Sequence, residues 1–260
     1  MNAKHKDVAE CTRPGILSSD EVRVWHSTLD VSRARLASLY QLLSPGERER
    51  AGRFRSIADA KRSIIGRGYL RLLLGRAIGL RAEELRFEYD EFGKPSLATD
   101  YRSELQFSVS HSGDCVLIAL ARGRAVGADV ERVRTDIDVA DLAKRFFSTT
   151  EAEKLACLTG PVLYKAFFAC WTCKEAYVKA KGQGISLPLN DFEVAFLPGE
   201  APGLLTTRPD PTEASRWKLF ALNVGQYHEA ALIAAGQDWH FSRGTLEHIE
   251  LPNLGKPLIT

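Results

Sequence analysis

The sequence lacks long hydrophobic runs, a strong net charge and the paired cysteines of a disulfide scaffold. No apolar stretch approaches the roughly 18 residues that a membrane span requires, and no apolar signal core follows Met1. We therefore expect a cytoplasmic protein without a membrane partner. The net charge of +2 is too small to make nucleic acid the main partner. With 260 residues, 45% of them hydrophobic, the chain can form one large core or two small ones.

Five cysteines are present, an odd number without the spacing of a disulfide framework. Cys170 and Cys173 form a Cys-x-x-Cys pair, but no second pair or nearby histidines complete a zinc site. The pair lies inside an apolar helical run, whereas a thioredoxin-type motif follows a strand at the start of a helix. We interpret these residues as buried structural thiols, with redox chemistry as the alternative.

Basic residues are concentrated between Arg48 and Arg76, with few acids among them. The ordinary interpretation of such a run is a solvated helix face. A site for a phosphorylated ligand is the more specific interpretation. A nucleic-acid-binding module is a third, although no base-reading motif accompanies the run.

The first half of the chain is predicted to begin with a strand at 21–29 and to continue with helices before further strands. The hydrophobic spacing predicts helices at 31–43, 44–54 and 56–79 and strands at 85–89, 106–110 and 116–121. Ser44 and Glu47 have the spacing of a capping box. Turns are predicted at 90–95, 111–114 and 121–124.

The second half repeats a similar order of elements. It is predicted to contain a strand at 127–131, helices ending at Phe147 and spanning 161–181, and strands at 192–196, 217–222 and 230–234. Residues 148–151 have the spacing of a second capping box. Residues 198–211 are predicted to form a mobile connection, and an edge strand is expected after Gly244. We predict an α+β fold of two similar α/β lobes, 1–124 and 125–260, related by pseudo-two-fold symmetry with the active site in the cleft between them.

Acidic residues in two separate segments point to phosphate chemistry. Glu175 and Lys179 are four residues apart on a predicted helix, so they share one face. Asp129 and Glu131 alternate on a predicted strand and point to one side, and Gly127 before them would let a ligand approach the backbone. Three carboxylates brought together repel each other unless a hard cation such as Mg2+ lies among them. For Glu175 and Lys179 a surface ion pair is the ordinary alternative.

Five motifs in a fixed order resemble the phosphopantetheinyl transferases of the surfactin-synthetase-activating type. They are Glu91–Pro95, Phe107–Asp114, Gly127–Glu131, Arg145–Ser148 and Trp171–Lys179, the last followed by Gly182 and Gly184. The resemblance implies transfer of the 4'-phosphopantetheine arm of coenzyme A to a serine of an apo acyl or peptidyl carrier protein. The products would be holo carrier protein and adenosine 3',5'-bisphosphate.

The resemblance also implies roles for the acidic residues and the lysine. Asp129, Glu131 and Glu175 would hold Mg2+ against the pyrophosphate, where the metal would neutralise charge on the leaving phosphate. Glu175 would take the serine proton, directly or through water. Lys179 would stabilise or protonate the departing group.

Coenzyme A itself would meet a second set of residues. By resemblance, Ser110, His111 and Arg62 would contact its phosphates, and Lys94 would lie beside its adenosine or pyrophosphate end. Glu47 stands where a basic residue is frequent in the family, and Arg50 would compensate for it.

The carrier protein, typically a small acidic helical domain, would dock along the lobe junction at residues 138–150. If Phe146 and Phe147 are exposed beside Lys144 and Arg145, this surface would suit the acidic carrier protein. The alternative is that both phenylalanine rings are buried in the core. Trp171 is expected to pack in the core and to position Glu175. We expect a monomer, and the competing hypothesis is a coenzyme A or nucleotide-binding protein that no longer catalyses.

Overall fold

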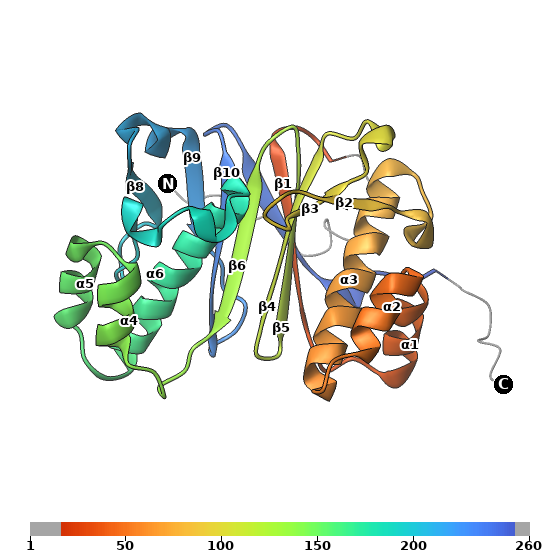
Figure 1. Ribbon diagram of the computed structural model, residues 1–260, viewed down its shortest axis with the longest axis horizontal. Coiled ribbons are helices and arrows are strands. Elements are labelled where there is room, and N and C mark those ends of the chain that lie inside the picture. Colours follow the sequence, from red (N-terminus) through yellow and green to blue (C-terminus); the bar gives the residue numbers. More distant parts are fainter. Residues whose placement is uncertain (1–16, 253–260) are drawn as a thin grey trace.

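The computed structural model describes residues 17–252. Two sheets stand side by side at its centre, with helix α3 (Ile57–Ile78) over one and helix α6 (Gly160–Lys181) over the other (Figure 1). Helices and strands are mixed in both halves, so the predicted α+β class is confirmed. Residues 1–16, which include Cys11, and residues 253–260 lie outside the described range.

The first half forms most of a four-stranded sheet and its helical cover. Its elements are β1 (Glu21–Thr28), α1 (Arg33–Gln41), α2 (Pro45–Gly52), α3, β2 (Phe87–Tyr89), β3 (Pro95–Leu97), β4 (Leu105–Ser112) and β5 (Cys115–Arg122). The sheet has the order β11-β1-β5-β4, and β2 and β3 form a separate hairpin. Ser44 and Glu47 form the predicted capping box at α2, and Ser56 and Gly79 cap α3 as expected.

The second half forms a three-stranded sheet, β6-β10-β9, and a separate pair, β7 with β8. Its elements are β6 (Val126–Arg132), α4 (Val139–Phe146), α5 (Thr149–Ala156), α6, β7 (Phe192–Ala195), β8 (Gly203–Thr207), β9 (Trp217–Ala221), β10 (His228–Ala235) and β11 (His240–Thr245). The second predicted capping box, Ser148 with Glu151, begins α5.

Three local predictions were wrong. The segment 198–211 is not only a connection, because it contains β8, which pairs with β7 and places Leu204 against the core. No edge strand continues after Gly244, because β11 ends at Thr245. Leu246 is buried and begins a 3-10 turn instead. His111 belongs to β4 and not to the following turn, because the pairing of β4 with β5 extends to Ser112.

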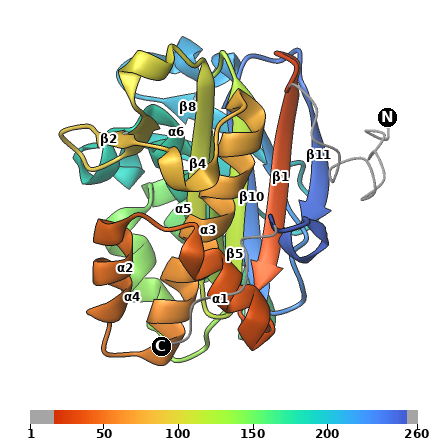
Figure 2. The same ribbon diagram turned by 90° about the vertical axis from the view of Figure 1, so that its right-hand side faces the viewer.

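Strand β11 returns the chain to the first lobe. It pairs in parallel with β1, at the edge of the four-stranded sheet (Figure 2). Beyond it, Leu246 and Ile249 are buried in the core that includes Leu39, and the Glu247 carboxylate accepts a 2.7 Å hydrogen bond from the Ser27 hydroxyl. The last described segment therefore packs on the first lobe, although the sequence division at 124 assigns it to the second.

Strand β6 and helix α6 touch through their backbones at Gly127. A Cβ atom at Gly127 would lie 1.9 Å from the Ala176 carbonyl oxygen and 2.6 Å from the Ala180 nitrogen. Because Gly127 has no side chain, the backbone of α6 can pack directly against β6. The sequence had suggested that this space would be used by a ligand. This contact sets the distance between the acidic strand and the helix that carries Glu175 and Lys179.

Gly127→Ala should therefore destabilise the protein by about 1–3 kcal/mol or more, because neither backbone can yield without shifting a whole element. Urea unfolding measures the change. Gly46→Ala is the matched control, since its Cβ would meet nothing within 4 Å in α2. Equal stabilities for the Gly127 variant and the wild type would contradict the close packing of β6 on α6.

The cysteines of α6 are buried, as the sequence interpretation expected. Cys170 and Cys173 are 0% and 3% exposed, and both thiols are free. Burial raises the pKa of Cys173 to about 12 and also raises that of Cys170. Protonated, inaccessible thiols are poor nucleophiles, which argues against a redox role.

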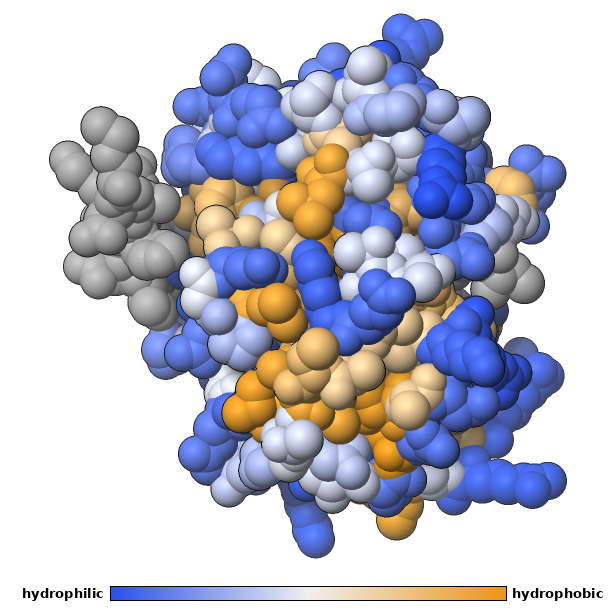
Figure 3. Space-filling view, turned by 90° about the vertical axis from the view of Figure 1, so that its left-hand side faces the viewer, coloured by the Kyte–Doolittle hydropathy of each residue, from blue (hydrophilic) through white to orange (hydrophobic). Residues whose placement is uncertain are grey.

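Within residues 17–252, no helix combines the length and apolar character needed to cross a membrane. On the face formed by α4 and α5, apolar side chains are exposed among charged ones (Figure 3). Exposed apolar residues of the second half include Phe146, Val162 and Leu205.

Candidate active site

The acidic strand and the helix bring three predicted residues into contact. The Lys179 ammonium on α6 lies 2.6 Å from Oδ1 of Asp129 on β6 and 2.8 Å from the Ser110 hydroxyl on β4. The Ser110 hydroxyl also donates a 2.6 Å hydrogen bond to Oδ1 of Asp129. Lys179 therefore forms its ion pair with Asp129 across two elements, and not with Glu175 along its own helix.

Asp129 is only 3% exposed, and its two carboxylate oxygens differ. Oδ1 receives Lys179 and Ser110, whereas among the described residues none donates a hydrogen bond to the buried Oδ2. A buried acceptor without a partner costs free energy unless a ligand or ion satisfies it. Oδ2 is thus an acceptor available to a bound group.

Glu175 and Glu131 flank Asp129 and share its negative field. Burial, followed by the charge of Asp129, raises the pKa of Glu175 against the opposing effect of Lys179. Burial also raises the pKa of Glu131, although a hydrogen bond from Ser112 opposes the increase. Both carboxylates are therefore held where their charge is disfavoured, which is typical of a site that awaits a cation or a proton.

Glu175→Gln should raise the free energy of unfolding at pH 7, because it removes a carboxylate whose charge the folded protein disfavours. A group with a raised folded-state pKa binds more protons when folded, so its contribution to stability falls as pH rises through that pKa. The advantage of glutamine should thus be greatest above the raised pKa and disappear as pH falls below 4.5. Urea unfolding at several pH values measures it.

Glu153→Gln, at an exposed position of α5, is the control and should change stability little. A Glu175→Gln protein less stable than the wild type at pH 7 would show that the Glu175 charge is compensated in the folded chain.

By donor type the acidic residues fit Mg2+, but they are not preassembled around one point. Carboxylate oxygens are the ligands that this ion prefers, and the unpaired Oδ2 of Asp129 offers one. Among residues 17–252, however, no three histidine, cysteine or acidic side chains are grouped so that they could hold a metal ion. Metal binding would therefore require side-chain movement at Asp129, Glu131 or Glu175.

The predicted phosphate contacts gather near Lys179. Ser110 and His111 lie on β4, and the Arg62 guanidinium on α3 donates a 2.6 Å hydrogen bond to the Gly113 carbonyl just beyond. Desolvation by neighbouring protein atoms, and after it the positive charges of Lys179 and Arg62, lower the pKa of His111. The residue nevertheless lies at the surface, where a ligand can reach it. These residues form a corner rich in donors, suited to an anionic group.

Lys94 and Arg50, which the resemblance places at coenzyme A, have different surroundings in the structure. The Lys94 ammonium donates hydrogen bonds to the carbonyl oxygens of Lys179 at 2.7 Å and Ala180 at 3.3 Å, at the end of α6. Lys94 thus caps the helix in this conformation. Arg50 is exposed on α2, and no described contact joins its side chain to the acidic residues.

Glu47 has a structural role that explains its acidic character. Its carboxylate accepts hydrogen bonds from Arg67 at 2.6 Å and from the buried Arg71 at 2.5 Å, besides closing the capping box. Other members of the basic run are also paired, such as Arg53 with Glu49. The run is therefore neutralised in part within the fold and does not form an uninterrupted basic stripe.

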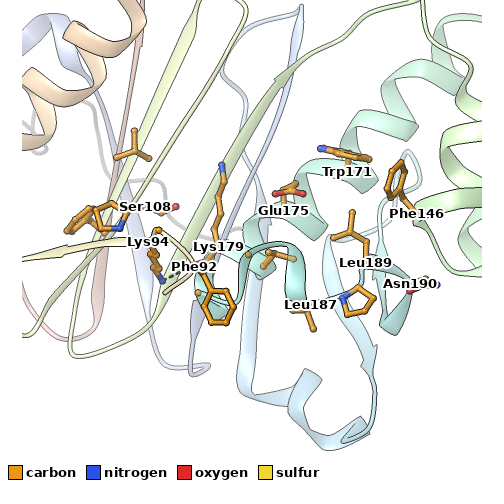
Figure 4. Close-up of a pocket in the computed structure, with 18 of the residues that line it drawn as sticks. Phe92, Lys94, Ser108, Phe146, Trp171, Glu175, Lys179, Leu187, Leu189 and Asn190 are labelled. Carbon is orange, nitrogen blue, oxygen red and sulfur yellow. Dashed lines mark hydrogen bonds between the residues drawn. The ribbon is translucent and has the colours of Figure 1, made fainter. Parts of the chain in front are cut away.

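A cavity of about 730 Å3 opens beside Glu175 and Lys179, with walls from both halves of the chain (Figure 4). Its lining is mainly apolar and includes Phe92, Lys94, Phe107, Ser108, Phe146, Trp171, Leu187, Leu189 and Asn190. No sequence pattern pointed to Leu187, Leu189 or Asn190 as residues of the site. These residues follow Gly184, the last residue of the motif, and only the turn after α6 brings them back to the site.

The aromatic residues near the cavity divide their roles. Phe147 is 4% exposed and packs against Phe167, whereas Phe146 is 36% exposed and lines the cavity. The sequence suggested that both phenylalanines are exposed or that both are buried, and both suggestions were wrong. Trp171 packs against both phenylalanines, but it also lines the cavity beside Glu175.

Together these features place a group of hydrogen-bond donors next to a mainly apolar cavity. Two family models match the chain. The family described as 4'-phosphopantetheinyl transferase superfamily matches residues 125–234, and the family described as 4'-phosphopantetheinyl transferase, N-terminal, matches residues 27–122. The two matches meet close to the predicted lobe junction.

Two curated relatives have the same designation. The 4'-phosphopantetheinyl transferase HetI of Nostoc sp. is 39% identical over 224 residues, which are 86% of this chain and 91% of that protein. The 4'-phosphopantetheinyl transferase Sfp of Bacillus subtilis is 34% identical over 152 residues, 58% of this chain and 66% of that protein. The chain therefore belongs to the 4'-phosphopantetheinyl transferase superfamily. The predicted resemblance to the surfactin-synthetase-activating type, to which Sfp belongs, is confirmed.

A solved structure, holo-[acyl-carrier-protein] synthase of Thermotoga maritima, is 20% identical and aligns with 44% of this chain and 63% of that chain. The TM-score of 0.35 is too low to carry residue positions from one structure to the other.

Proposed function

We propose that this protein transfers the 4'-phosphopantetheine moiety of coenzyme A to a serine of an apo carrier protein, with Mg2+ as cofactor. The observation that supports the proposal best is the position of Lys179. It lines the apolar cavity and at the same time forms an ion pair with the buried Asp129. An anionic ligand bound there would meet the ammonium group at the end of a channel suited to an uncharged arm.

Coenzyme A fits this arrangement in chemical terms. Its pantetheine arm would occupy the cavity, whose volume of about 730 Å3 is within the usual range of ligand pockets. Its phosphates would meet Lys179, Ser110, His111 and Arg62. Lys94, which also lines the cavity, would offer the ligand the ammonium hydrogen that its two carbonyl contacts at the end of α6 leave free.

Asp129, Glu131 and Glu175 would hold Mg2+, which would polarise the attacked phosphorus and balance the charge of the pyrophosphate. The remaining steps belong to the chain itself. Glu175 would accept the proton of the carrier serine, directly or through water, as the serine oxygen attacks phosphorus. Lys179 would stabilise the departing phosphate with the ammonium hydrogen that its contacts with Asp129 and Ser110 leave free.

The carrier protein would dock beside the exposed Phe146 and Arg145, both of which line the cavity mouth. An aromatic anchor next to a positive charge suits an acidic helical partner. We further propose a cytoplasmic monomer of two lobes related by pseudo-two-fold symmetry, because both halves of one chain supply the cavity walls. Neither nucleic acid nor a membrane is required as a partner.

Intact mass measurement of an apo carrier domain, after incubation with the protein, coenzyme A and Mg2+, tests the function. We expect the mass to increase by one phosphopantetheine, with no increase in a sample treated with a metal chelator. Binding of coenzyme A without modification of any of several carriers would support a catalytically inactive binding protein instead. Modification that survives removal of divalent metal would contradict the metal assignment alone.

A further inference from the structure

Strands β4 and β6 are neighbours that belong to different sheets. Each lies at the edge of its own sheet, β4 beside β5 and β6 beside β10. The edge of a strand presents unpaired backbone groups, which need partners when they are buried. Here the partners are the hydroxyl groups of Ser108, Ser110 and Ser112, which share one face of β4 because side chains alternate along a strand.

Each hydroxyl accepts a backbone N–H from β6, in constant register. Ser108 accepts from Ala128 at 3.0 Å, Ser110 from Val130 at 3.4 Å and Ser112 from Arg132 at 3.1 Å. We call these three serines the hydroxyl seam.

A hydroxyl that accepts a hydrogen bond still has one hydrogen to donate. Ser108 donates to the Ala128 carbonyl at 3.3 Å, Ser110 to Oδ1 of Asp129 at 2.6 Å and Ser112 to Oε2 of Glu131 at 2.5 Å. Two of the three hydrogens are therefore directed at carboxylates assigned to the metal. The backbone contact holds each serine oxygen in place, and the hydroxyl hydrogen, which rotates about the C–O bond, can then reach the neighbouring carboxylate.

We propose that Ser112 is a positioning residue for the reaction: through the hydroxyl seam it fixes the Glu131 carboxylate for Mg2+. This inference rests on the proposed function, because it assigns Ser112 an effect through a metal ligand. Ser112 has no assigned contact with coenzyme A or with the reacting atoms, so its effect passes through Glu131 alone.

One serine serves as the matched control. Ser27 is a buried serine on β1 that donates to the Glu247 carboxylate outside the site, so Ser27→Ala removes the same type of bond elsewhere.

Calorimetric titration of Mg2+ into the full-length protein saturated with coenzyme A tests the proposal without turnover. Ser112→Ala should weaken Mg2+ binding roughly ten-fold, the lower range for residues that orient a metal ligand. Ser112→Thr, which keeps the hydroxyl, should recover most of the affinity. If the alanine variant does not fold, Ser112→Cys, with its weak S–H donor, should show the same loss.

Ser112→Ala added to Glu131→Gln should cause no further loss, because the serine acts only through that carboxylate. Unchanged Mg2+ affinity in a folded Ser112→Ala or Ser112→Cys protein would overturn the proposal. So would an equal loss in Ser27→Ala, which would assign the effect to a general loosening of the fold and not to Glu131. A wild-type protein that modifies carriers but binds no Mg2+ would overturn the metal assignment, and this failure is visible without any variant.

Discussion

Asp129→Asn is expected to lower the rate of phosphopantetheine transfer about a thousand-fold while the protein remains folded. Asparagine keeps the shape of the side chain but removes the charge that pairs with Lys179 and the oxygen charge that a cation requires. Loss of charge stabilisation by a catalytic metal is worth several kcal/mol, and about 4 kcal/mol corresponds to a thousand-fold in rate. The initial rate of carrier modification, followed by intact mass, gives the change.

The control for this variant is Asp100→Asn, which removes an exposed carboxylate that pairs with Arg86 away from the site. It should leave transfer within about two-fold of the wild type, since exposed ion pairs contribute little. Near-normal turnover by a folded Asp129→Asn protein would mean that the Asp129 charge has no part in the reaction. Loss of folding would be detected by urea unfolding before any rate is compared.

Lys174→Met is expected to lower the free energy of unfolding by about 3–5 kcal/mol. Lys174 is 0% exposed, and its ammonium lies 2.7 Å from Oε2 of Glu151, which is 1% exposed. The ammonium also donates to the carbonyl oxygens of Leu189 at 2.8 Å and Phe192 at 2.5 Å. Methionine would leave the buried Glu151 charge and both carbonyl groups without the ammonium.

The buried pair joins α5 to α6 next to the site. Lys174 precedes Glu175 on α6, Glu151 lies in the first turn of α5, and Leu189, whose carbonyl accepts from Lys174, lines the cavity. Since natural domains are stable by only about 5–15 kcal/mol, the expected loss is a large part of the total.

Urea unfolding measures this loss, and the slope of the free energy of unfolding against urea concentration should be the same as in the wild type. Arg53→Met is the control, since it breaks an exposed pair with Glu49 within α2 and should cost no more than about 0.5 kcal/mol. Glu151→Gln should resemble Lys174→Met, because it leaves the ammonium buried without a counter-charge. A loss below 1 kcal/mol in both variants would show that the pair is compensated by water or by protonation.

Sequence spacing predicted the acidic part of the site well. Asp129 and Glu131 share a face because side chains alternate along β6, and Glu175 and Lys179 share a face because a helix repeats every 3.6 residues. The Ser44 and Ser148 caps were equally predictable, since each depends on residues only three positions apart. These are local relations, so they are readable without knowing what packs against them.

Partners across the fold were not predictable in the same way. The sequence did not indicate that Lys94 donates to the end of α6 or that Ser112 donates to Glu131. Phe146 and Phe147 are adjacent and chemically identical, yet only the packing of α4 on α6 decides that one is exposed and the other buried. Such outcomes depend on long-range contacts that no local period records.

By itself, the sequence determined the family, the α+β class, the caps of the helices and which acidic and basic side chains share a face of a strand or a helix. All of these follow from residue type and short spacing, which act within one or two turns of chain. The tertiary structure alone decided that β11 returns to β1, that Gly127 admits α6, and that the hydroxyl seam joins the two sheets at the carboxylates. These features arise where segments distant in sequence compete for the same buried space and hydrogen-bond partners, so they are determined only when the whole chain packs.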